Sequence, residues 1–318
     1  LEITIACSYL FRTTLNGIDG RRWIARLSLA ADDLNAGDRL WFHLVRADLA
    51  QGSADHRTGR DAAERATDLA DEADAPTSMI ANHLGALHLV VPDPQEATKR
   101  FTAAARGARD AGLDRIEHLM GAFAAMAALS AGEVEHGAEL AEEVAHDVAG
   151  DGYEVFIAHW AAWTACLLRG DTDRLRYWTD RQRSFLLGAG VTEPWLFLWS
   201  VALLHAMEGG DAVEGLRLAR ERADIEGHDV AADIVLALAI VAQHRGHFVE
   251  AAELLGAIAG ARLNNLSHYV LERNLQSRLQ AELGGAGLTA ALDRGSSATP
   301  ASILAGRGLE LMASVAAG

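Results

Sequence analysis

The sequence predicts an all-α fold, a right-handed superhelix of about seven helical hairpins with a C-terminal helical cap. Three observations lead to this prediction. Ala- and Leu-rich segments with apolar residues at helical spacing are separated by short polar turns that contain glycine or proline. These turns recur at intervals of roughly 35 to 41 residues, the range of helical-hairpin repeats. Within each predicted pair the first helix is more apolar than the second, which is typical of an inner layer packed on both sides and an outer layer facing water.

The turn at Gly246 shows the repeat most clearly. It follows one Ala/Leu-rich helix and starts another, in which the apolar residues recur at i, i+3, i+4, i+7 and i+11 and so form one buried face. These residues are Phe248, Ala251, Ala252, Leu255 and Ala259.

Seven helix pairs follow from these breaks along residues 1–262, which we assign to the repeat array. The pairs are 3–15 with 19–34, 37–51 with 57–73, 77–90 with 95–111, 114–131 with 133–149, 152–169 with 172–188, 193–208 with 212–226, and 229–245 with 248–261.

The pattern changes after the seventh pair, and we assign 263–318 to the cap. A helix over 267–283 is expected to end at Gly284-Gly285, and a short helix over 288–293 follows. The last helix starts at Pro300, with Thr299 as its N-cap, because proline is tolerated at the first helical position and threonine accepts a backbone hydrogen bond there.

Composition excludes several kinds of protein. No run approaches the roughly 18 to 20 apolar residues of a membrane span, so we expect no membrane contact. The net charge is −16, and the arginines are scattered instead of clustered, so this segment is not expected to bind nucleic acid. The one lysine, Lys99, follows no glycine loop, which argues against a Walker-type nucleotide site. Cys7 and Cys166 are expected to be buried free thiols in a reducing cytoplasm.

Known catalytic and metal motifs such as HExxH and GxSxG do not occur, so no catalytic residue, metal or cofactor is assigned. Because the chain opens at Leu1 directly in a helical pattern, we expect it to be a fragment of a longer protein.

Two groups of residues are candidates for binding a ligand or a protein partner. His43 and His83 occupy equivalent positions in neighbouring first helices, so their imidazoles are expected to lie side by side on the concave surface, where they would bind an anion, a metal or a carboxylate. The alternative is that the two histidines are isolated and partly exposed.

The second group lies in the fifth and sixth hairpins, which hold most of the tryptophans. Trp163 and Trp199, with His159 as a polar contact, are expected to line an aromatic groove for a small ligand or a peptide helix. The alternative is that these rings only pack the hairpins together.

The chain resembles a known family in two stretches. The run from Gly246 to Ala257, the following helix with Leu279 and Leu283, and the Thr299-Pro300 start resemble the C-terminal helical-repeat region of actinobacterial STAND-type ATPase regulators, and Gly20-Arg21-Arg22-Trp23 resembles an early repeat helix of the same proteins. These are the large ATP-binding LuxR and maltose-regulator-like proteins, some with adenylyl cyclase-like or SARP domains. Because the tetratricopeptide signature is not kept from repeat to repeat, the hairpins are TPR-like.

The resemblance implies a non-enzymatic sensory or protein-interaction module of a cytoplasmic transcriptional regulator, working through a small-molecule inducer, a protein partner or self-association. The ATPase and DNA-binding domains of such a protein would lie outside this chain. Two alternatives remain: a passive protein–protein scaffold, and an α/α-toroid enzyme, which is less compatible with the short turns because toroid active sites are built on long loops.

Overall fold

The computed structural model describes residues 34–52, 56–70, 82, 86, 92–150, 152–261, 263 and 266–307. All regular structure within these residues is helical, as predicted. The predicted helices 3–15 and 19–34 lie outside them, apart from residue 34, and so does most of 77–90. The chain divides into two compact units, Leu1–Val148 and Ala149–Gly318. This division does not test the predicted boundary at 262.

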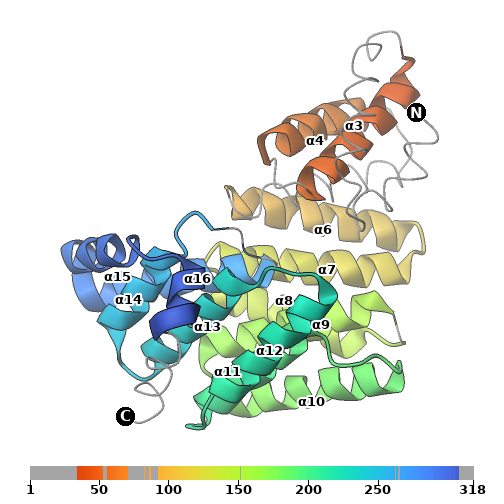
Figure 1. Cartoon of the computed structure of the whole chain (residues 1–318). Helices are drawn as coiled ribbons and strands as arrows, with labels where there is room; N and C mark the ends of the chain where they lie inside the picture. The colour runs from red at the N-terminus through yellow and green to blue at the C-terminus, as the bar shows by residue number, and fades with distance from the viewer. Residues whose placement is uncertain are drawn as a thin grey trace. The chain divides into compact units, whose positions relative to one another are not determined.

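The described part of the first unit consists of helices that pack on their neighbours in the sequence (Figure 1). Helix α3 packs on α4, α6 packs on α7, and α7 packs on α8. The bounds are Ala36–Gly52 for α3, His56–Ala70 for α4, Pro94–Asp110 for α6, Asp114–Ser130 for α7 and Val134–Asp147 for α8. They agree with the predicted spans to within a few residues.

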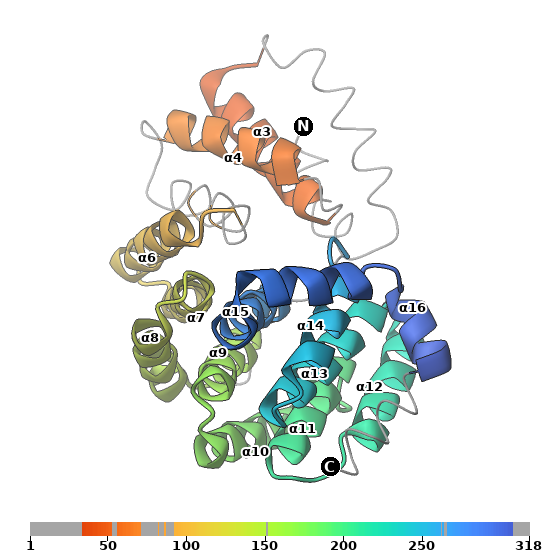
Figure 2. The same cartoon turned by 90° about the vertical axis from the view of Figure 1, so that its left-hand side faces the viewer.

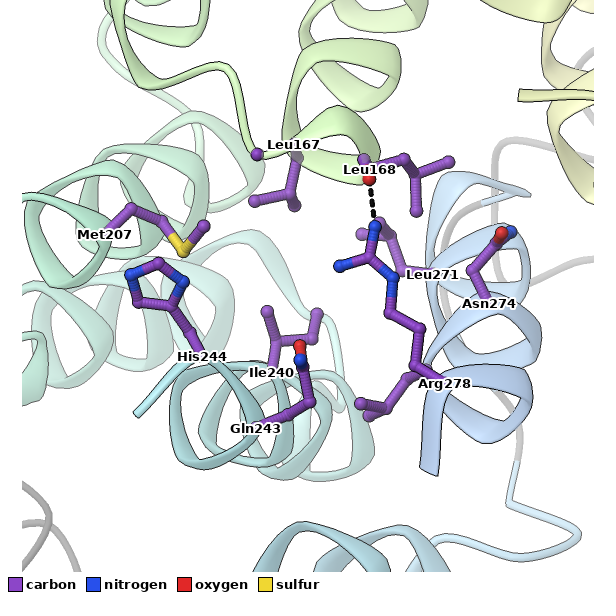
Figure 3. Close-up of a pocket in the computed structure, with 11 residues that line it drawn as sticks. Leu167, Leu168, Met207, Ile240, Gln243, His244, Leu271, Asn274 and Arg278 are labelled. Carbon is purple, nitrogen blue, oxygen red and sulfur yellow. Dashed lines mark hydrogen bonds between the residues drawn. The ribbon is translucent and has the colours of Figure 1, made fainter. Parts of the chain in front are cut away.

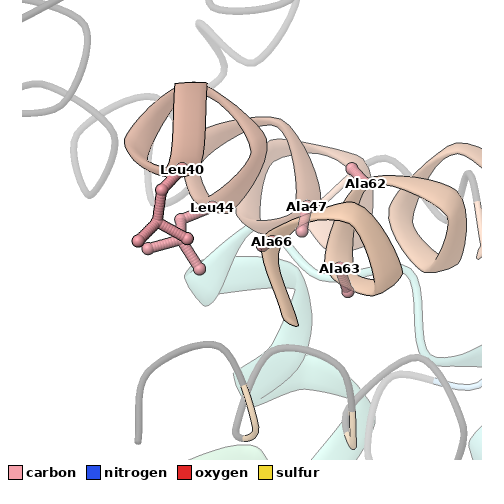
Figure 4. Close-up of a cluster of buried hydrophobic side chains, with 6 residues drawn as sticks. All are labelled: Leu40, Leu44, Ala47, Ala62, Ala63 and Ala66. Carbon is pink, nitrogen blue, oxygen red and sulfur yellow. The ribbon is translucent and has the colours of Figure 1, made fainter. Parts of the chain in front are cut away.

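Helices α3 and α4 meet through small side chains (Figure 4). Two leucines and four alanines are buried at this contact, and the alanines let the two backbones approach closely. The cluster consists of Leu40, Leu44, Ala47, Ala62, Ala63 and Ala66.

The described part of the second unit contains three helical hairpins, in which α9 packs on α10, α11 on α12 and α13 on α14. The bounds are Tyr153–Arg169 for α9, Thr172–Gly188 for α10, Trp195–Met207 for α11, Val213–Glu226 for α12, Ala231–His244 for α13 and Phe248–Ala257 for α14. Helix α11 also packs on α10 and on α13, so each hairpin of this group contacts the next one along the chain. This pairwise packing is consistent with a helical repeat.

First and second helices differ in burial as predicted. Every residue from 232 to 242 in α13 is buried, whereas α12 buries only Leu216, Ala219 and Ala223. Helix α13 is therefore enclosed along most of its length, whereas α12 exposes most of its surface.

The turn between α9 and α10 shows how the sequence ends one helix and starts the next. Gly170 has a φ of 71°, a left-handed conformation that suits glycine, and its N–H bonds the Leu167 carbonyl at 3.2 Å. One residue later the Asp171 carboxylate accepts a hydrogen bond from the Arg174 N–H at 3.1 Å and caps α10.

Two helical pieces that meet at Gly284 make up the helix α15, Leu266–Gly295. The break falls where the sequence predicted a helix end, but the second piece continues to Gly295, beyond the predicted 288–293. The helix packs on α9, α13 and α14 (Figure 2). Helix α16, Pro300–Ser302, begins with the predicted cap, in which Thr299 Oγ1 accepts from the Ser302 N–H at 3.1 Å, and runs into the π-helix η2, Ile303–Arg307.

No helix in the described ranges is both long enough and apolar enough to span a membrane.

The second piece of α15 lies in backbone contact with α14. A Cβ atom added at Gly256 would lie 2.2 Å from the carbonyl oxygen of Leu292. Backbone atoms cannot move aside as a flexible side chain does, so this contact requires glycine at position 256.

We therefore expect Gly256→Ala to lower the free energy of unfolding by about 2 to 3 kcal/mol, because the methyl group forces the two helices apart. Gly188→Ala is the matched control, since a Cβ there meets no atom within 4 Å. Urea denaturation of both variants measures the difference. Equal effects of the two substitutions would contradict the close contact between α14 and α15.

Candidate functional site

The tryptophans of α9 and α11 form a buried layer in the second unit. The ring centroids of Trp160 and Trp163 are 5.1 Å apart, and those of Trp163 and Trp199 are 6.1 Å apart. Two indole N–H groups of this layer bond to neighbouring helices: Trp163 donates to Thr179 Oγ1 at 3.1 Å, and Trp199 donates to the carbonyl oxygen of Asp233 at 2.9 Å. The rings thus join α9 to α10 and α11 to α13.

Helix α15 covers this layer. Trp160 donates its indole N–H to Ser267 Oγ at 2.8 Å, and the His268 ring lies 4.3 Å from the Trp199 ring. Both Ser267 and His268 are completely buried. Helix α15 therefore contacts two of the rings in this layer, those of Trp160 and Trp199.

A buried polar pair holds α15 in this position. His268 Nδ1 lies 2.5 Å from Asp233 Oδ1, and neither side chain is exposed to solvent. The two atoms share one hydrogen bond, whose direction is set by the tautomer of the His268 ring. Removal of either side chain would leave the other one buried without this hydrogen bond. The pair therefore stabilises the register of α15 on α13 in which the two side chains meet.

A half-open pocket of about 120 Å³ lies beside this contact (Figure 3). It is bounded by the C-terminal ends of α9, α11 and α13 and by the first piece of α15. The lining residues are Leu167, Leu168, Gly170, Met207, Ile240, Gln243, His244, Leu271, Asn274, Leu275 and Arg278.

Arg278 connects the two sides of the pocket. Its Nη2 donates a hydrogen bond to the carbonyl oxygen of Leu168 in the last turn of α9. Cations are favoured at this end of a helix, where the macrodipole is negative. Figure 3 shows the guanidinium facing the same space as the side chains of Gln243 and Ile240. Asn274 instead donates to the Val270 carbonyl of its own helix at 2.9 Å.

The first unit has a larger hollow of about 310 Å³ between α6, α7 and α8. Both acidic and basic side chains line it. Arg109 Nε donates to Glu117 Oε1 at 2.6 Å, and this hydrogen bond raises the pKa of the guanidinium. Further polar residues of this hollow are Arg106, His118, Glu143 and Asp147. The charges are thus partly paired within the protein, in contrast to the pocket at Arg278.

None of the predicted binding residues that the structure describes lines either hollow. His43 is buried in α3, and His83 lies outside the described residues, so their pairing stays a prediction. His159 is buried with its ring centroid 5.4 Å from that of Trp178, and Trp163 and Trp199 belong to the buried layer. The predicted role of these residues in binding also stays a prediction.

Sequence reasoning missed the polar residues of the pocket, above all Gln243 and Arg278. We assigned the helix that carries Arg278 to the terminal cap and did not weigh its polar face. The available signal was the i, i+4, i+7, i+11 spacing of Ser267, Leu271, Asn274 and Arg278, which lie on one side of a helix.

Among the described residues, no group of three or more His, Cys, Asp or Glu side chains is placed to hold a metal ion. Cys166 is buried as a thiol, as expected, and Cys7 lies outside these residues.

We expect Asp233→Ala to lower the free energy of unfolding by roughly 3 to 5 kcal/mol, because it leaves the His268 imidazole buried without its carboxylate. Asp180→Ala is the control, since Asp180 pairs with Arg183 at 3.8 Å on the surface and its removal should cause no measurable change. Chemical denaturation measures both. A double variant with His268→Ala should cost less than the sum of the single changes, and strict additivity would contradict the coupling.

His43 is expected to remain neutral in the folded protein down to acidic pH. Burial, reinforced by the nearby Arg65, Arg46 and Arg39, lowers its pKa from 6.5 to about 4. The unfolded chain therefore binds the proton more readily, and the stability contributed by neutral His43 is complete above about pH 6.5 and is lost as the pH falls toward 4. The NMR titration midpoint of the His43 ring, and the pH dependence of unfolding of wild type against His43→Asn, measure this. A midpoint near 6.5 would contradict the prediction.

The half-open pocket beside α15 is lined by apolar side chains, by the Arg278 guanidinium and by the polar side chains of Gln243, His244 and Asn274. No model of a known protein family, no curated protein and no solved structure matches this chain.

Proposed function

We propose that this chain is a non-enzymatic sensory or protein-interaction module of a cytoplasmic, signal-responsive transcriptional regulator. In this proposal the stacked hairpins form a right-handed TPR-like superhelix like that of the STAND-type ATPase regulators, and the effector domains belong to other parts of the protein. The sequence resemblance supports the family, and the paired helices of both units support the repeat architecture.

One observation carries the sensory role: the pocket lies between the repeat helices and α15. Leu168, Met207 and Gln243 come from the ends of α9, α11 and α13, whereas Leu271 and Arg278 come from α15. A molecule in this pocket would contact both sides at once. Its affinity would therefore differ between conformations of the protein in which α15 is placed differently.

Such differential binding is what a ligand needs in order to shift a conformational equilibrium. In the proposed mechanism, occupation of the pocket changes how firmly the first piece of α15 is held on α9 and α13. A neighbouring domain or a partner protein would then respond to the change in α15.

The second candidate function is a passive protein–protein scaffold without a small ligand. The observation that favours it is the complete burial of Trp163 and Trp199 in the layer that α15 covers. In a scaffold, α15 would only complete the core, and proteins would bind elsewhere on the repeat surface.

Native mass spectrometry of the full chain, purified without added ligands, tests the proposal. A sensor is expected to retain a small molecule in gentle ionisation and to lose it after denaturation, because the molecule is held by the folded pocket. An Ile240→Trp variant, which fills the pocket, should not carry the molecule, whereas Leu187→Trp on the exposed face of α10 should carry it.

A clean ligand-free mass together with defined dimers would instead favour the protein-interaction arm of the proposal. A monomeric, ligand-free chain whose α15 exchanges amide hydrogens as slowly as α13 would favour the passive scaffold.

A further inference from the structure

We infer that the pocket between α9, α11, α13 and α15 binds a small organic monocarboxylate, with the carboxylate on Arg278 and a short apolar tail against the leucines. This inference rests on the proposed sensory function and names the class of its ligand. Four features of the pocket support it: charge, free hydrogen-bond donors, size and the nature of the walls.

The charge of the lining is positive in a strongly acidic protein. The chain carries a net charge of −16, yet among the described residues that line this pocket none is Asp or Glu, and Arg278 is the one Arg or Lys. The hollow in the first unit differs, because Glu117, Glu143 and Asp147 line it beside its arginines. An anion in the pocket at Arg278 meets no carboxylate from the lining.

Arg278 keeps donors available for a ligand. A guanidinium has five N–H groups, and within the described part of the chain Arg278 uses Nη2 to bond the Leu168 carbonyl. Figure 3 shows the guanidinium facing the pocket together with the Gln243 side chain. A carboxylate is the anion whose two oxygens match two parallel guanidinium N–H groups.

The helix ends around the pocket oppose an anion only weakly. Three helices end there, and their last carbonyls carry partial negative charge that falls off within one turn. These carbonyls are already bonded by N–H groups of the following turns, as in Gly170 N–H to Leu167 O at 3.2 Å and Gly246 N–H to Gln243 O at 3.0 Å. The Arg278 guanidinium, a full charge, itself bonds the end of α9.

The volume limits the ligand to a few atoms. At about 120 Å³ the pocket is slightly smaller than a cavity of about 150 Å³ that holds benzene, so roughly six non-hydrogen atoms fit. The apolar part of the lining consists of Leu167, Met207 and Ile240 on the repeat helices and of Leu271 and Leu275 on α15, beside the polar Gln243, His244 and Asn274. A second charge on the ligand would lie against these apolar side chains without a partner, which disfavours dicarboxylates and inorganic phosphate.

Butyrate has the predicted size and charge, and its isosteres separate the contributions. Isothermal titration calorimetry of the full chain at low ionic strength would compare sodium butyrate with butyramide, n-butylamine and inorganic phosphate. We expect saturable binding of butyrate and at least about tenfold weaker binding of butyramide, because the charge-assisted bonds to Arg278 are lost. Butylamine, which the guanidinium repels, should not bind.

Two arginine variants of the same helix locate the site. Arg278→Leu should abolish butyrate binding, whereas Arg294→Leu should leave it unchanged, because Arg294 pairs with Glu253 on the surface at 2.7 Å. Arg278→Lys keeps the charge but not the paired N–H groups and should weaken binding by about tenfold. Circular dichroism and urea denaturation check that each variant is folded. If Arg278→Leu does not fold, the affinity of Arg278→Lys for butyrate and the comparison of ligands on the wild type still test whether a carboxylate binds at Arg278.

Several results would overturn the inference: no saturable binding of butyrate to the folded wild type, equal binding of butyramide, phosphate binding as tight as butyrate, or unchanged butyrate affinity in Arg278→Lys. The proposed sensory function fails separately. The sensory function would stand if butyrate does not bind but native mass spectrometry finds a retained molecule of another class. It would fall if no molecule is retained and neither ligands nor protein partners change the conformation or the self-association of the chain.

Discussion

The structure of the second unit depends on the burial of polar groups that α15 satisfies. Asp233 and the indole N–H of Trp160 are enclosed among apolar helices, and a buried polar group without a hydrogen bond is costly. Ser267 and His268 supply the partners, at 2.8 Å and 2.5 Å. Apolar contact alone would allow α15 to slide along α13, whereas two hydrogen bonds of fixed direction allow a single register. The tryptophan layer and the docked helix therefore form one core.

That register also builds the pocket. Arg278 follows His268 by ten residues on the same helix, a rise of about 15 Å, and this spacing places the guanidinium at the end of α9. The bond to Leu168 offsets the partial charge of that helix end and fastens α15 at a second point. A small cavity remains between the two attachment points, where leucine side chains face the ends of three helices. The pocket is thus a consequence of how the helix is docked, and any molecule that occupies it acts on the docking.

The first unit is assembled by a different kind of contact. At the interface of α3 and α4 the buried residues are leucines and alanines, and His43 beside them is held neutral by burial and by arginines. Its hollow between α6, α7 and α8 contains opposite charges that pair with each other, as in Arg109 with Glu117. Helices with the same pattern thus pack in two ways. In the first unit α3 and α4 meet through apolar side chains, and in the second unit buried hydrogen bonds hold α15 on its neighbours.

The sequence by itself determined the helices, because their signals are local. Turn glycines, the Asp171 and Thr299 caps and the apolar spacing act within a few residues, so the predicted helices from 95 to 261 and the start at Pro300 agree with the structure to within a few residues. Only the tertiary structure decided what covers the tryptophans and where the pocket lies. Trp160 and Ser267 are 107 residues apart, and Leu168 and Arg278 are 110 apart, and no local pattern links such positions. The residues of the pocket were missed for the same reason. The local sequence around Arg278 does not distinguish it from an exposed arginine, and only the packing of α15 on α9 places it in a pocket.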